Sequence, residues 1–183
     1  MESMLMYGDR SLVPGEAVRL LALGALMEKD CRYGDLATEI RFFTQRIVGP
    51  SLDLLGSSLE LLRIEGLADA VEHAENDERA LLRITDSGRS LFEDLMSAQL
   101  RAPVNDVGRL VLLLKLRFLT YLPTEAQEDQ LDLLSDIVRT ERARAAELVK
   151  EFGDHPIADW LAFDIEQADR RIAWLESALK KLA

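Results

Sequence analysis

The stretch from residue 50 to residue 95 constrains the fold most, because it orders a helix, a tight exit and a hairpin. Its first part carries leucines at helical spacing, namely Leu52, Leu55, Leu59 and Leu62. Gly66 follows where a helix end favours a left-handed residue. Residues 67–74 and 80–85 are short apolar runs on either side of a polar turn. This order predicts a winged helix-turn-helix with a two-stranded wing.

The winged domain is expected to span residues 14–101. Its first helix begins at Pro14, a residue that suits the first helical position. Gly49-Pro50 breaks the chain before the third helix, which we expect to be the recognition helix. After the wing, Thr85 or Asp86 can cap a closing helix. Aromatic residues are expected to fill the core of this domain, namely Tyr33, Phe42 and Phe43.

Residues 104–183 are expected to form a helical dimerisation domain, which makes the fold mainly α. The segment 107–121 is apolar on nearly every face, so we expect it to be buried on all sides, in part by a partner chain. The last helix alternates by three and four residues, the spacing of a coiled-coil seam. Self-association is favoured over a helical hairpin folded on its own domain. The expected dimerisation residues are Leu110, Leu114, Phe118, Ile165, Ile172, Leu175 and Leu179.

The charge of the chain opposes binding to a polyanion. The net charge is −11, and residues 1–95 hold ten Lys and Arg against 18 Asp and Glu. Carboxylates repel phosphates, so the overall field is unfavourable for DNA. Local placement of arginines can still prevail, because salt screens exposed charges within about 8 Å.

The sequence gives little support for metal binding or catalysis. Cys31 is the single cysteine, and His73 and His155 lack the spacing of metal ligands. We therefore expect no metal, no cofactor and no enzymatic activity. The start of the chain lacks the pattern of a secretory signal, and the apolar run 110–122 is too short to span a bilayer. A cytoplasmic protein without membrane contact is expected.

The candidate DNA-binding residues are polar or basic. Arg41 and Arg46, between the second and third helices, are candidates for phosphate contacts, and Arg79 at the wing tip could enter a minor groove. The recognition helix offers hydroxyls for phosphate or base edges, from Ser51, Ser57 and Ser58. Arg63 is a weaker candidate. A solvated helix face and a charged hairpin tip remain the alternative interpretations of these residues.

Trp160 and Trp174 lie on the last helix. Two interpretations remain for them. They could line a pocket for a small-molecule effector, or they could be packed in the domain. Packing is the favoured interpretation.

Four segments together resemble the PadR family of bacterial transcription regulators: Leu59–Leu67, Leu82–Leu91, Leu114–Leu119 and Ile172–Glu176. The first resembles the end of the recognition helix of that family, and the second resembles its wing exit. The other two resemble the start and the final helix of its dimerisation region. The resemblance covers residues 15–183. It implies a homodimer that binds a double-stranded DNA operator, and repression that a small-molecule effector relieves.

The sequence therefore predicts a dimeric, DNA-binding transcriptional regulator that acts as a repressor by occluding its operator. An alternative follows from the excess of acid and the recognition helix with few basic residues. In that case the winged helix would be a protein–protein interaction module that does not bind DNA.

Overall fold

The computed structural model describes residues 10–49, 55–71 and 79–182. Its contacts divide the chain into two compact units. The first unit contains the residues up to Gln99 together with Asn105–Tyr121, and the second contains Leu100–Val104 and the residues from Leu122 onward. Among the described residues, no helix combines the length and the apolar character that a bilayer crossing requires.

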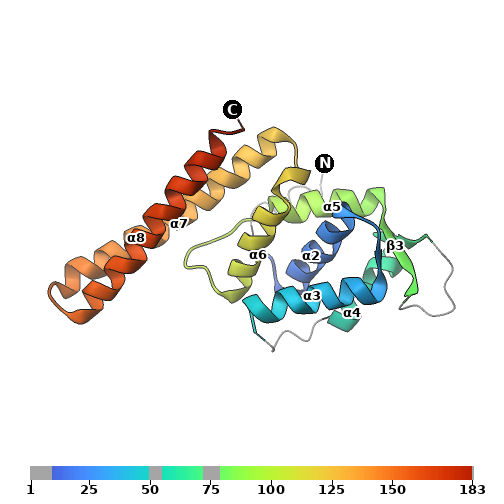
Figure 1. The fold of residues 1–183 in the computed structure, drawn as a ribbon, viewed down its shortest axis with the longest axis horizontal. Helices are drawn as coiled ribbons and strands as arrows, with labels where there is room; N and C mark the ends of the chain where they lie inside the picture. Colours follow the sequence, from blue (N-terminus) through green and yellow to red (C-terminus); the bar gives the residue numbers. More distant parts are fainter. Residues whose placement is uncertain (1–9, 50–54, 72–78, 183) are drawn as a thin grey trace. The chain divides into compact units, whose positions relative to one another are not determined.

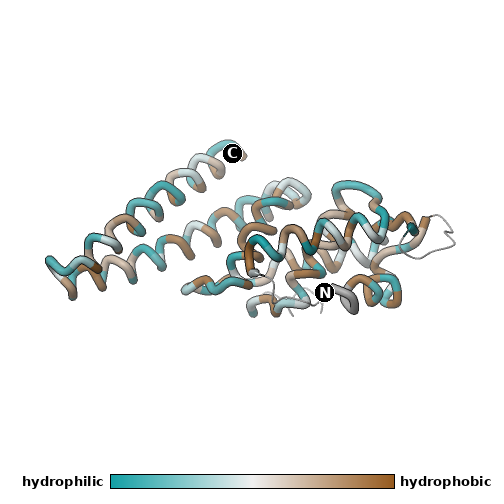
Figure 2. The backbone as a smooth tube through the Cα atoms, turned by 60° about the horizontal axis from the view of Figure 1, so that its bottom comes forward, coloured by the Kyte–Doolittle hydropathy of each residue, from teal (hydrophilic) through white to brown (hydrophobic). Residues whose placement is uncertain are grey.

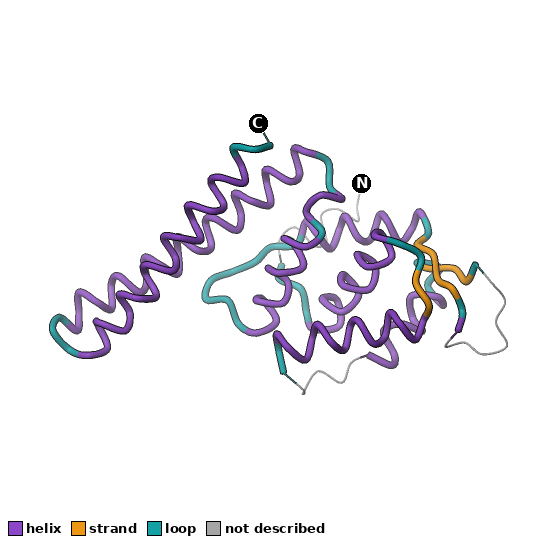
Figure 3. The backbone as a smooth tube through the Cα atoms, viewed as in Figure 1, coloured by secondary structure: helices purple, strands orange, loops and turns teal. Residues whose placement is uncertain are grey.

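The first unit is built mainly from helices (Figures 1 and 3). Its elements are α2 (Pro14–Glu28), β1 (Cys31–Arg32), α3 (Tyr33–Ile47), α4 (Leu55–Ile64), β2 (Ala68–Ala70), β3 (Leu81–Ile84), α5 (Asp86–Ser97), α6 (Asp106–Arg117) and a short 3₁₀ turn, η2 (Leu119–Tyr121). The second unit contains α7 (Thr124–Phe152) and α8 (Pro156–Leu179). The prediction of a mainly α, winged helix-turn-helix fold is confirmed.

The wing contains one strand more than the sequence predicted. Strands β2 and β3 pair antiparallel, with Asp69 opposite Arg83. Strand β1 pairs with the other edge of β3, where Cys31 lies opposite Leu82, so the strand order is β1-β3-β2. A two-residue strand has no periodicity to detect, which is why the sequence predicted two strands. The polar turn 75–78 lies outside the described residues.

Helix α2 lies at the centre of the first unit. It contacts α3, α4, α5, α6 and β3. The buried residues of α2 surround its axis: Ala17, Val18, Leu20, Leu21, Ala22, Leu23, Gly24, Ala25 and Leu26. A helix that is apolar all round requires cover on every side. Here the other elements of the same unit provide that cover.

Helix α6 packs against α2 at Gly24. A Cβ atom placed on Gly24 would lie 2.2 Å from the Phe118 ring, which follows α6 directly. The same ring meets Phe92 of α5 edge-on, with 6.0 Å between ring centroids. The missing side chain at residue 24 therefore allows the Phe118 ring to lie directly on the α2 backbone.

This packing changes the expected role of α6. Leu110, Leu114 and Phe118 are fully buried within a single chain, so their side chains offer no surface to a partner. We expected them in a dimer interface, and the structure places them in a core. Leu112, Leu113 and Leu116 on the same segment are only half-buried, so its burial is not complete on all sides.

The division into units also differs from the expected domains, 14–101 and 104–183. Helix α6 belongs with the first unit, and the loop 100–104 belongs with the second. In the second unit, the Val104 amide donates a hydrogen bond to Glu141 Oε1 of α7 at 2.9 Å. A loop with a proline marks a break in secondary structure. The unit to which each flanking helix belongs depends instead on the elements that the helix packs against.

Two charged residues of α6 are held within the first unit. Lys115 is buried and donates from Nζ to the Met96 carbonyl in α5, and burial lowers the pKa of Lys115 to about 7. Arg117 donates to Glu28 of α2 at 2.9 Å and to Glu39 of α3. Burial opposes the charge of Arg117, but these two carboxylates outweigh it and raise its pKa. Arg117 therefore ties α6 to both α2 and α3.

The second unit is an antiparallel hairpin of α7 and α8, in which apolar and polar residues alternate along both helices (Figure 2). The loop between the helices contains Gly153, which has a φ of +54°. The buried residues of the seam are Leu131, Leu134, Ile137 and Val138 from α7, and Ala158, Ala168 and Leu175 from α8. Ion pairs cross between the helices, Arg139 with Glu176 at 3.0 Å and Arg142 with Asp169 at 2.5 Å.

The predicted seam of the last helix therefore faces α7 of the same chain. Leu175 is buried in it, and Ile165, Ile172 and Leu179 are half-buried. For these residues the structure shows the helical hairpin that the sequence left as the alternative to self-association.

Gly24→Ala should destabilise the first unit. The added methyl group collides with the buried Phe118 ring, which also packs edge-on against Phe92, so we expect a loss on the order of 1–3 kcal/mol in unfolding free energy. Gly15→Ala is the matched control, because nothing lies within 4 Å of its new methyl group. Urea denaturation followed by circular dichroism measures both. Equal stability of the two variants would contradict the close packing at Gly24.

Lys115 should make the unfolding free energy depend on pH. Its pKa is about 7 in the folded chain against an ordinary value of 10.5. Between these values the unfolded chain binds the proton more tightly, so the contribution of Lys115 rises with pH. The unfolding free energy of the wild type minus that of Lys115→Met should therefore increase from pH 7 to pH 10. A difference that is constant or falls over this range would contradict burial of the ammonium group.

Candidate nucleic-acid interface

Helix α3 exposes two arginines and one aspartate, Asp35, on its outer face. Its inner face is formed by Leu36, Ile40 and Thr44, and the Thr44 hydroxyl donates to the Ile40 carbonyl at 2.8 Å. This packing fixes the rotation of the helix, so Arg41 and Arg46 are exposed. They lie about 140° apart around the helix axis, one at each border of the outer face.

Arg46 is held in place by its own helix. Its Nη1 donates to the Phe42 carbonyl at 3.1 Å, and its guanidinium lies 3.5 Å from the centroid of the Phe42 ring. Phe42 is 55% exposed, so the expectation that it fills the core was wrong. A stacked guanidinium keeps its remaining N–H groups available while its rotamers are restricted. Arg46 is thus preorganised for contact with an anion.

Helix α4 occupies the position of the recognition helix. Leu59 and Leu62 are buried, while Glu60, Arg63 and Ile64 are exposed. Gly66 has a φ of +69°, which confirms the predicted left-handed helix end. Ser51 and the side chains of Ser57 and Ser58 lie outside the described part of the structure. Their contacts with DNA remain predictions.

Two arginines lie together at the turn end of strand β3. Arg79 is exposed, and its carbonyl accepts a hydrogen bond at 2.8 Å from Nη1 of Arg32, the last residue of β1. Arg83 on β3 instead binds Asp30, with Nε–Oδ2 at 3.0 Å and Nη2–Oδ2 at 2.5 Å. The hydrogen bonds from Arg83 lower the pKa of Asp30. The Asp30 carboxylate in turn offsets the positive charge of Arg83. Sequence reasoning did not select Arg32, because it had no strand to place it beside the wing.

Several acidic side chains around this face have their own partners, whereas the exposed Asp35 of α3 and Glu60 of α4 form no ion pair within the described residues. Glu28 and Glu39 bind Arg117, Asp30 binds Arg83, and Glu65 at the end of α4 binds Arg19 of α2. Within the described residues, no carboxylate lies at salt-bridge distance from the following arginines: Arg32, Arg41, Arg46 and Arg79. These four arginines therefore lie on α3, next to its start and at the turn end of β3.

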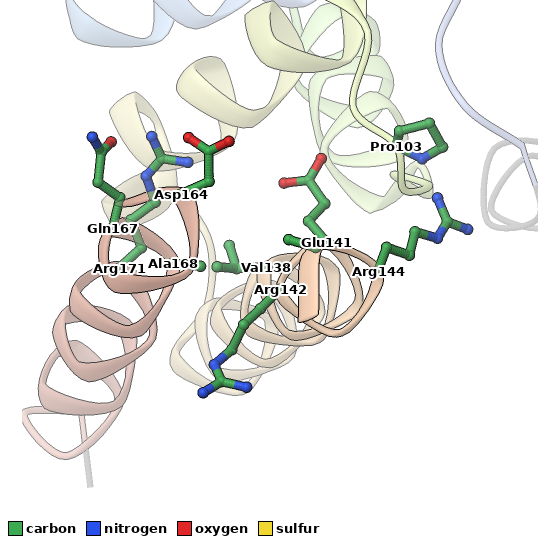
Figure 4. Close-up of a pocket in the computed structure, with 10 residues that line it drawn as sticks. Pro103, Val138, Glu141, Arg142, Arg144, Asp164, Gln167, Ala168 and Arg171 are labelled. Atoms are coloured by element: carbon green, nitrogen blue, oxygen red, sulfur yellow. The ribbon is translucent and has the colours of Figure 1, made fainter. Parts of the chain in front are cut away.

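The second unit contains a separate groove of about 320 Å³ between α7 and α8. Val138 and Ala168 form its floor, and charged side chains line its rim (Figure 4). Figure 4 shows Asp164, Gln167 and Arg171 projecting from α8. Trp160 and Trp174 do not line this groove and are largely exposed, so the expectation that they are packed was wrong.

Comparison with known protein families gives a match over most of the chain. The family model described as "Putative AphA-like transcriptional regulator" matches residues 7–179. The chain belongs to this family of AphA-like transcriptional regulators. The predicted class of protein, a transcriptional regulator, is thereby confirmed. No curated protein matches the sequence of this AphA-like chain.

Solved structures with similarity to the AphA-like chain include Bacillus subtilis PadR in complex with operator DNA, with 17% identity over 90% of this chain and 98% of that chain and a TM-score of 0.37. A second is the PadR-like transcriptional regulator BC1756 from Bacillus cereus, with 19% identity over 90% and 97% of the two chains and a TM-score of 0.39. A third is Bacillus subtilis PadR in complex with p-coumaric acid, with 16% identity over 91% and 98% and a TM-score of 0.39.

Proposed function

We propose that this AphA-like regulator is a homodimeric repressor that binds double-stranded operator DNA through α3, α4 and the wing. One observation carries the proposal: Arg41, Arg46 and Arg79 are exposed on the winged unit without a carboxylate partner in the described part of the chain, while the nearby Glu28, Asp30 and Glu39 are paired. Exposed arginines without internal partners can pair with phosphates, and each such pair releases counterions. The acidic total charge does not prevent this, because salt screens the more distant carboxylates.

The arginines have a spacing that suits a duplex. Helix α3 separates Arg32 at its start from Arg46 near its end by about 20 Å along the axis. This is the rise of about six base pairs of a duplex. Arg41 and Arg46 would bind phosphates and set the register, and Arg79 would approach the groove beside the wing. Ser51, Ser57 and Ser58 would then contact phosphates or base edges from the recognition helix.

Dimerisation would place two winged units on one operator, which occludes it from other proteins. The predicted seam residues of α8 contact α7, so the surface available for a second copy is the exposed face of α8 with Trp160, Phe163 and Trp174. A dimer with twofold symmetry requires half-sites related by the same symmetry. A small-molecule effector that changes how the two copies pair would change the spacing of the winged units and relieve repression. The groove between α7 and α8 has room for such a molecule.

A second candidate function follows from the exposed side chains of α4. Glu60 and Ile64 point outward, and Ile64 is 76% exposed. An acidic and apolar surface fits a protein partner better than a phosphate backbone. In this alternative the winged unit is a protein–protein interaction module that does not bind DNA.

The double variant Arg41→Ala/Arg46→Ala should weaken DNA binding without loss of folding. Each phosphate contact contributes about 0.9 to the slope of log affinity against log salt, so the slope should fall by about two per bound chain. Fluorescence anisotropy with labelled genomic fragments, between about 50 and 200 mM salt, measures this. Arg139→Ala/Arg142→Ala is the control, because it removes the same charge from the second unit. An unchanged slope would contradict the proposed docking face. Absence of binding by the wild type at the lowest salt would favour the protein-interaction alternative.

A further inference from the structure

The outer face of α8 carries a row of exposed aromatic side chains. Trp160, Phe163 and Trp174 are 69%, 62% and 58% exposed. At about 100° per residue, the three side chains lie within about 60° of one another around the helix. The seam residues Ile165 and Ile172, half-buried against α7, point to the other side. Exposed aromatic side chains in such a row on one helix, with Gln167 between Phe163 and Trp174, indicate a contact surface.

This row is symmetric about Gln167. Trp160 and Trp174 each lie seven residues from it, and its own exposed side chain projects from the same side of α8. If a second copy of α8 lies antiparallel with the twofold axis at Gln167, Trp160 of each copy meets Trp174 of the other. Offset or edge-on contacts between such rings add to the free energy gained by their burial.

The residues beside the row are complementary in the same arrangement. Asp164 and Arg171 lie on one side of the row, and Phe163 and Arg170 lie on the other. In an antiparallel twofold pair, each side of the row lies against the same side of the row in the second copy. Asp164 therefore faces Arg171 of the second copy, and Phe163 faces Arg170. The first contact is an ion pair and the second a cation–π contact. Neither Arg170 nor Arg171 has an ion-pair partner among the described residues of its own chain.

A parallel arrangement is disfavoured by the same residues. It would bring opposite sides of the row together at the same height, so Arg171 would face Arg170 of the second copy, and like charges in contact oppose association. The three aromatic side chains together offer roughly 300–450 Å² of exposed area per chain, about half of the area per partner that a typical stable interface buries. The flanking residues of a helix about 36 Å long supply the remainder.

We propose that two copies of this chain pair through the outer face of α8, antiparallel, with the twofold axis at Gln167. The proposal rests on the homodimer of the proposed function and assigns its register. It identifies Trp160, Phe163 and Trp174 as the centre of the interface, and Asp164, Arg170 and Arg171 as the residues that select the antiparallel orientation.

Cysteine cross-linking of the full chain tests this register. Gln167→Cys places both thiols at the twofold axis, so mild oxidation should convert most of the protein to a disulfide-linked dimer on a non-reducing gel. Ala178→Cys is the matched control, because it lies on the same face but its two copies would be about 33 Å apart. Wild-type protein controls for Cys31, which is buried.

Each outcome has a distinct meaning. Cross-linking of Gln167→Cys alone supports the register, and efficient cross-linking of both variants indicates a parallel pair and overturns it. If neither variant cross-links while the wild type sediments as a dimer, the dimer uses another face, and only this inference fails. A wild type that sediments as a monomer at tens of micromolar contradicts the homodimer of the proposed function itself.

Charge reversal gives a second test that does not depend on cysteine chemistry. Asp164→Arg or Arg171→Asp alone should raise the dimer dissociation constant by about tenfold, because each change creates two like-charge contacts. The double variant should restore the wild-type value. A double variant as weak as the sum of the two single variants would show that these residues do not face each other across the axis.

Discussion

The close approach of α2 and α6 at Gly24 is the contact on which the first unit depends. Because residue 24 has no side chain, the Phe118 ring lies on the backbone of α2 and meets Phe92 of α5. This position brings the preceding residue, Arg117, to the carboxylates of Glu28 and Glu39. The inner side of α3 is thereby anchored to α2 and α6, and its outer face, with Arg41 and Arg46, is held on a rigid support.

Local rules predicted most elements of this fold. The left-handed Gly66 and the cap at Thr85, whose hydroxyl accepts the Gly88 amide at 3.0 Å, were read directly from residue types. The two-residue strand Cys31–Arg32 was not predicted, because it has no sequence pattern of its own and forms only by pairing with β3. The run 107–121 indicated that cover was needed, but an apolar sequence does not specify whether its own chain or a second chain provides it.

The candidate site was predictable by residue type but not by pairing. Arg79 and Arg83 are both arginines in or next to β3, and nothing in the sequence distinguishes their partners. Only Arg83 binds a carboxylate, that of Asp30, which is distant along the chain. In α8, periodicity identified the apolar seam, but it could not show that α7 of the same chain packs against it. The exposed tryptophans, which sequence reasoning favoured as packed, form the face that remains.

The interleaving of the two units has a consequence for how the protein can be dissected. The chain leaves the first unit after Gln99, returns at Asn105 and leaves again after Tyr121. A fragment that stops at residue 101 would lack the helix that covers α2, and would expose an apolar surface to water. A single proteolytic cut within the loop 100–104 would likewise not release an intact winged unit. The smallest autonomous winged fragment therefore extends through Tyr121, well past the last residue of the wing.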